Sequence, residues 1–137
     1  MKAFKIIMVL VLLAVPVLVQ VGCTTAAQYD IRGTWNVNLS YFDGTSDVFP
    51  FTFTGTTDAG VVTHTGVQYP GTYSVSGSSV EFAIEYVVLY TRSTETYDGS
   101  FGSATTMNGD FEWNTVPASQ LPAPLIWAWG TWSATKQ

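Results

Sequence analysis

The strongest constraint on this chain is a succession of short segments in which apolar and polar residues alternate. In segment 31–41, Trp35 and Leu39 fall on one side of an extended strand, and Asn36 and Ser40 fall on the other. Side chains alternate faces along a β-strand, so this pattern indicates a strand with one face in a core and one in water. Similar segments follow at 49–54, 61–65, 72–76, 80–90, 97–101, 107–113 and 126–135.

The links between these segments are short and show no helical periodicity. Asp43-Gly44 is a strong hairpin signal, and only the connection 114–124 is long. Parallel strands require long crossovers, so the order predicts an antiparallel meander. Closing a meander into a barrel removes both exposed edges. We therefore predict an all-β domain over 30–137, an eight-stranded antiparallel up-and-down meander barrel, with a two-sheet β-sandwich as the alternative.

The inward-facing positions of such a barrel would be rich in rings. An eight-stranded barrel has an interior that side chains can fill or that can hold one small ligand. Gly99, Gly109 and Gly130 would create room, so the sequence leaves both possibilities open. The rings that would fill the barrel are Phe49, Phe51, Phe53, Phe82, Tyr86, Phe101, Phe111, Trp113 and Trp132.

The first 22 residues have the composition of a secretory signal. Lys2 and Lys5 precede an apolar run that Pro16 and Gln20 interrupt, and a membrane-spanning helix would need about 20 apolar residues. We interpret 1–22 as a signal peptide and expect the protein to be exported.

Cys23 directly follows this signal and is the only cysteine, which excludes an intrachain disulfide. Its position resembles the lipidation site of bacterial lipoproteins, so we interpret 23–29 as a lipidated cysteine and tether. The resemblance implies anchoring in the bacterial cell envelope, with Thr24 favouring the outer membrane facing the periplasm. Ordinary cleavage after Ala27 is the alternative.

The exported chain would be strongly acidic. Arg32, Arg92 and Lys136 are the basic residues left outside the signal, against ten acidic ones. Such a surface repels phosphate backbones and anionic lipid. We therefore expect no nucleic-acid partner, and membrane contact only through the lipid anchor.

Two triplets resemble a known family. Gly33-Thr34-Trp35 opens the first strand and Gly130-Thr131-Trp132 lies in the last, as in the calycin barrels: lipocalins, fatty-acid-binding proteins and avidins. The resemblance implies that Trp35 plugs the closed end of the barrel, with Lys136 as the only nearby base to stack on it. Asn36 and Ser40 lie one position short of the avidin biotin contacts, on the opposite face. Biotin binding is therefore not expected.

The sequence contains no recognisable catalytic set. His64 is the only histidine, has no cysteine to activate, and is interpreted as a partly exposed strand residue. No metal-ligand spacing occurs, and we expect no cofactor and no enzymatic activity. Asp98 should lie opposite Asp110, near Glu112 and Glu85, where the carboxylates form a solvated face, a cation site or a surface for a basic partner.

The strongest functional hypothesis concerns one end of the barrel. Loops that follow the first, third, fifth and seventh strands of a meander gather there, together with aromatic residues that suit a small hydrophobic ligand or a protein anchor. We predict a non-enzymatic binding protein; the alternative is a protein-interaction or inhibitor module using loops or the acidic outer face. Loop 114–124 could instead cover these residues as a lid, and alternation puts Trp127 and Trp129 on the outer face. The predicted ligand-binding residues are Tyr41, Phe49, Tyr69, Tyr90, Trp113, Trp127 and Trp129.

Overall fold

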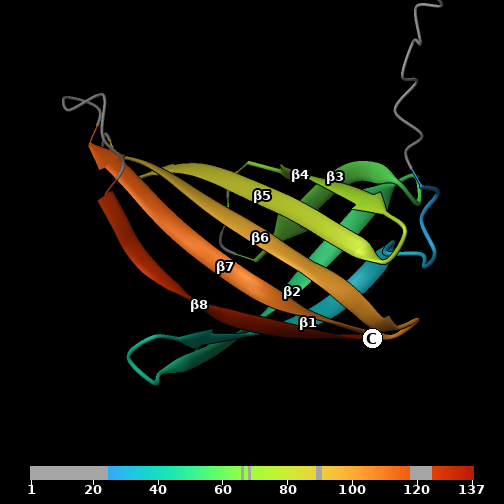
Figure 1. Ribbon diagram of the computed structural model, residues 1–137. Coiled ribbons are helices and arrows are strands. Elements are labelled where there is room, and N and C mark those ends of the chain that lie inside the picture. The colour runs from blue at the N-terminus through green and yellow to red at the C-terminus, as the bar shows by residue number, and fades with distance from the viewer. Residues whose placement is uncertain (1–24, 66, 68, 89–90, 118–124) are drawn as a thin grey trace, which may run out of the picture.

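The computed structural model is a closed antiparallel barrel in which each strand pairs with the next and β8 pairs with β1 (Figure 1). The structure describes residues 25–65, 67, 69–88, 91–117 and 125–137, and they contain no helix. The predicted all-β meander barrel is confirmed, and the sandwich alternative is wrong. The strands are β1 (Gly33–Tyr41), β2 (Ser46–Gly55), β3 (Ala59–His64), β4 (Gly71–Ser76), β5 (Ser79–Val88), β6 (Thr91–Ser103), β7 (Thr106–Pro117) and β8 (Leu125–Lys136).

Several strands are longer than the alternation predicted. β6 begins at Thr91, six residues before the first predicted strand position, Tyr97. The added stretch, 91–96, is polar on both faces and carries no alternation. It is nevertheless strand, because its backbone continues the ladders with β5 and β7. The cross-strand partners, rather than local composition, extend these strands.

The alternating pattern of β1 places side chains as expected. Trp35, Val37 and Leu39 are buried, whereas Asn36 and Ser40 are exposed. The interior behind them is largely aromatic. Phe82 stacks on Tyr97 with ring centroids 4.3 Å apart and meets Trp132 edge-on at 5.3 Å. These rings fill the middle of the barrel, and edge-to-face pairs of this kind add to the stability gained by burial.

Gly99 and Gly130 lie directly against aromatic rings and leave no void. A Cβ on Gly99 would lie 2.6 Å from the Trp132 ring, and one on Gly130 would lie 2.9 Å from the Phe111 ring. The Trp132 indole N–H donates a hydrogen bond of 3.0 Å to the Asp110 carbonyl oxygen, which fixes the ring in place. At this level of the barrel the interior is filled.

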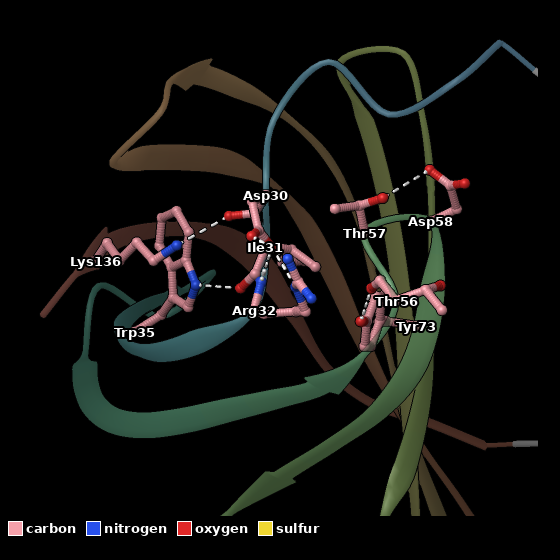
Figure 2. A network of polar contacts seen from close by, with 9 residues as sticks. All are labelled: Asp30, Ile31, Arg32, Trp35, Thr56, Thr57, Asp58, Tyr73 and Lys136. Carbon is pink, nitrogen blue, oxygen red and sulfur yellow. Dashed lines mark hydrogen bonds and ion pairs between the residues drawn. The ribbon is translucent and has the colours of Figure 1, made fainter.

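Trp35 lies at one end of the barrel, within a network of polar contacts (Figure 2). Its indole N–H donates to the Ile31 carbonyl oxygen at 2.6 Å. Lys136 Nζ lies 5.4 Å from the Trp35 ring centroid and donates to the Asp30 carbonyl oxygen at 3.0 Å. The Asp30 side chain is held by an ion pair of 2.7 Å with Arg32. We call this the closed end.

The segment that leads into the first strand also lies against the closed end. The backbone of Gln28 donates to Gly77 at 2.7 Å, and Gly77 donates to Thr25 at 3.2 Å. The Tyr29 ring packs on Phe101 with centroids 5.1 Å apart. The described part of the predicted tether is therefore docked on the barrel. The predicted signal peptide and Cys23 lie outside the described residues. Within those residues, no helix has the length and apolar character needed to cross a membrane.

Candidate functional site

The opposite end of the barrel, which we call the mouth, holds three of the predicted ligand-binding residues on its inner side. Tyr41 and Phe49 are half-buried and pack against the core. The Tyr41 ring meets Phe111 edge-on at 5.3 Å. Trp113 lies two residues beyond Phe111 on β7 and is half-buried opposite Glu95 of β6. These three side chains reach the mouth from β1, β2 and β7.

The other predicted residues do not join them inside. Trp129 is 57% exposed on the outer face and stacks on Phe42, with ring centroids 5.5 Å apart. Tyr69 is 51% exposed, after the end of β3. Tyr90 lies outside the described residues, and so does the side chain of Trp127.

A histidine and a carboxylate face each other inside the mouth. His64 ends β3 and is paired with the buried Phe51 of β2. Glu95 lies on β6 between the inward-facing partners Ile84 and Trp113. His64 Nε2 and a Glu95 carboxylate oxygen are 3.8 Å apart, and the two side chains are 10% and 15% exposed. The prediction of His64 as a partly exposed strand residue is confirmed, and its parity on β3 turns the side chain inward.

The contacts of the imidazole determine its tautomer. His64 Nδ1 lies 3.0 Å from the Thr65 carbonyl oxygen. A carbonyl oxygen can only accept, so Nδ1 carries the proton of this hydrogen bond. In the neutral ring Nε2 is then an acceptor. It is buried without a hydrogen-bond partner among the described residues, and the ring is held by Phe51, at 4.7 Å between centroids.

The Glu95 carboxylate is oriented from the core side. The hydroxyl of Tyr97, a residue only 1% exposed, donates to a Glu95 carboxylate oxygen at 2.9 Å. Further hydroxyl groups lie on the same inner face, where Ser93 Oγ and Thr115 Oγ1 are 3.1 Å apart. Burying a carboxylate is costly unless its oxygens are paired, so such a group in an apolar barrel marks a specialised site.

The phenol of Tyr41 lies in the field of two carboxylates. Burial, followed by the nearby Asp47 and Glu95, raises the pKa of Tyr41 to about 12. Asp47 is the cross-strand partner of the inward-facing Leu39, which places it on the inner side at the rim. The inner side of the mouth therefore combines aromatic rings with negative charge.

Glu95 is not among the residues predicted for the site. The signal that could have found it is parity: Phe101 was predicted inward, and Glu95, six positions earlier on the same strand, falls on the same face.

The acidic outer face is partly as predicted. Asp98 lies directly across from Asp110, as expected, but its partner on β5 is Glu81 and not Glu85. Glu85 instead binds Arg92. Of the described side chains, no group of three or more His, Cys, Asp or Glu residues could hold a metal ion.

Comparison with known proteins gives one structural neighbour of interest. No protein-family model matches the chain, and no curated protein matches it. Among solved structures, the chain is similar to EF1p2_mFAP2b bound to DFHBI, with 18% identity and a TM-score of 0.56. The match covers 77% of this chain and 93% of the other. At this identity the likeness concerns the fold. The chain is an all-β, closed eight-stranded antiparallel meander barrel that shares its fold with a protein solved in a ligand complex.

Proposed function

We propose that this protein is a non-enzymatic, calycin-like binding barrel that holds a small hydrophobic ligand at its mouth. The observation that carries the proposal is the His64–Glu95 pair. Two hydrogen-bonding groups are set inside a largely apolar interior, with a buried imidazole nitrogen that has no hydrogen-bond partner within the described part of the chain. Ligand sites combine apolar walls with a few placed polar groups in this way.

Two further facts support binding at this end. The middle of the barrel is filled by Tyr97, Phe82 and Trp132, so a ligand would be confined to the mouth. The structural neighbour was solved with DFHBI bound, and it shares the barrel fold. The inner aromatic residues Tyr41, Phe49 and Trp113 would provide the apolar contacts.

The experiment that tests this function is native mass spectrometry of the purified exported chain, followed by tryptophan fluorescence with the extracted ligand. We expect a co-purifying small apolar molecule whose quenching of fluorescence is lost in Trp113→Ala. Trp129→Ala is the matched control, because that ring lies on the outer face and should leave the affinity unchanged. Equal quenching in wild type and Trp113→Ala would remove the mouth as the site.

The second candidate function is a protein-interaction module, favoured by a specific outer feature. Phe42 is 59% exposed and stacks on Trp129, and the Phe42 backbone N–H donates to the Trp129 carbonyl oxygen at 3.1 Å. An exposed, rigid aromatic pair is typical of an interface anchor. Binding of a protein partner that is lost in Trp129→Ala and kept in Trp113→Ala would favour this function over ligand carriage.

We also propose that the protein is exported and lipid-anchored through Cys23 in the bacterial cell envelope, at the outer membrane facing the periplasm. Support comes from the basic and apolar composition of 1–22 and from the position of Cys23. Labelling with a radioactive fatty acid should mark the wild type and not Cys23→Ser. Label retained by Cys23→Ser would exclude this anchor.

A further inference from the structure

The pair inside the mouth also indicates what chemical class of ligand it suits. This inference rests on the proposed function and concerns the same site. In its neutral form His64 presents an acceptor at Nε2, because Nδ1 is the donor to Thr65. Glu95 presents a carboxylate oxygen 3.8 Å from that nitrogen. Direct N–H···O hydrogen bonds span about 2.7 to 3.2 Å, so two acceptors face each other across a gap longer than a hydrogen bond.

A donor with more than one hydrogen could bond to both atoms: to the His64 Nε2 acceptor and to the Glu95 oxygen, which also accepts from the Tyr97 hydroxyl. A protonated primary amine has three N–H groups, and one nitrogen about 2.8 Å from both atoms can bridge acceptors at this separation. A hydroxyl has a single hydrogen and could serve only one of them. A ligand carboxylate would bring a third acceptor beside Glu95, which like-charge repulsion disfavours.

The charges around the His64–Glu95 pair also favour a cationic ligand. Glu95 and Asp47 both lie on the inner side of the mouth, and after burial both contribute to the raised pKa of Tyr41. None of the Lys and Arg side chains that the structure describes lies inside the mouth, where it would neutralise these carboxylates. Arg32 and Lys136 are engaged at the closed end, and Arg92 binds Glu85 on the outer face.

The walls of the mouth suit a cation with an apolar body. Phe49 and Phe51 lie against the His64 ring, at 5.6 and 4.7 Å between centroids. Aromatic faces attract a nearby cation by a further 0.5 to 2 kcal/mol, roughly, and pack against apolar chains without a polar cost. Ring faces and carboxylates thus lie side by side at the mouth.

We propose that the mouth binds an amphiphilic primary amine, whose ammonium group lies between His64 and Glu95 while its apolar part packs on the half-buried Phe49. In the competing arrangement, His64 itself carries a second ring proton at Nε2. The imidazolium would then pair with Glu95 directly and leave no preference for a charged ligand.

The test uses three probes with one apolar chain: decylammonium, decanol and decanoate, titrated calorimetrically against the full exported chain. We expect decylammonium to bind at least about tenfold more tightly than decanol, as befits a charge-assisted hydrogen bond, and decanoate to bind most weakly. Glu95→Gln should abolish the preference for the amine while decanol binding persists. Glu112→Gln, an equal charge change on the outer face, should keep the preference.

The outcomes separate the two proposals. If decanol and decylammonium bind equally to wild type, or if Glu95→Gln keeps the preference, the amine class is overturned and the hydrophobic carrier stands. Tightest binding of decanoate overturns the amine class as well. If none of the three probes binds and no apolar molecule co-purifies, the carrier function fails together with the amine class. Far-ultraviolet circular dichroism and the unfolding midpoint of each variant establish that lost binding is not lost folding.

Discussion

Lys136 on the last strand lies over the ring of Trp35 on the first, with Nζ 5.4 Å from the ring centroid. The same ammonium group donates a hydrogen bond of 3.0 Å to the Asp30 carbonyl oxygen. The residue therefore joins three parts of the closed end: the leading segment, the buried tryptophan and the end of β8. One side chain thus connects the leading segment to both strands that meet where the barrel closes.

Replacing this lysine should weaken the closed end measurably. Lys136→Met keeps most of the apolar stem but removes the cation and the hydrogen bond. We expect the free energy of unfolding to fall by about 1 to 2 kcal/mol, from denaturant titration. Lys136→Arg is the control, because arginine also stacks on aromatic rings and should retain most of the stability. An unchanged denaturant midpoint of unfolding in Lys136→Met would show that the contact with Trp35 and Asp30 contributes nothing to stability.

The close packing of β8 makes Gly130 intolerant of any side chain. A Cβ there would lie 2.0 Å from the Ser40 carbonyl oxygen and 2.9 Å from the Phe111 ring. We expect Gly130→Ala to lower the free energy of unfolding by about 2 to 3 kcal/mol, because overpacking forces neighbouring atoms to shift. In Gly102→Ala the new methyl would meet only the Thr106 hydroxyl, at 3.1 Å, and a loss within about 0.5 kcal/mol is expected.

The Asp30 carboxylate should make stability depend on acid pH. Its hydrogen bond to the Arg32 side chain lowers the pKa of Asp30 from 3.8 to about 2. A depressed folded-state pKa gives stability that is present above about 3.8 and is lost as the pH falls towards about 2. The group is largely exposed, so the effect should be modest. Thermal melts between these pH values should show a shallower loss in Asp30→Asn than in wild type; parallel curves would contradict the assignment.

Tyr41 should give the opposite dependence at alkaline pH. Its pKa is raised from 10 to about 12, so its contribution to stability is present below 10 and is lost as the pH rises through about 12. Ultraviolet titration of phenolate formation should show one tyrosine with a midpoint near 12 that is missing in Tyr41→Phe. Tyr73→Phe should leave this midpoint in place. In Glu95→Gln the midpoint should move down, because one of the nearby carboxylates is gone.

Much of the fold followed from the sequence because alternation and turn residues are local signals. Trp35 and Val37 face inward exactly where period two places them, and the hairpin signal at Asp43-Gly44 coincides with the turn where Gly44 has a φ of 85°. Barrel closure was predicted from the need to remove edges. Strand ends were predicted less well, because the polar stretch 91–96 carries no alternation and is held in the sheet by its neighbours.

The candidate site was harder to predict. Tyr41, Phe49 and Trp113 could be placed at the mouth from topology alone. The approach of His64 to Glu95 depends on the stagger between β3 and β6, which no local pattern encodes. The interpretation of His64 as a partly exposed strand residue named no carboxylate partner for it, because that partner lies on a strand distant in the sequence.

The seam between β1 and β8 has a consequence for how the chain reaches this structure. Seven of the eight strand pairings join neighbours in the sequence and close short loops. The eighth joins segments such as those of Asn36 and Gln137, whose side chains are hydrogen-bonded although they are 101 positions apart. The entropy of loop closure grows with loop length, and non-local pairings slow folding. Substitutions along this seam should therefore change the folding rate more than equally destabilising ones within a hairpin.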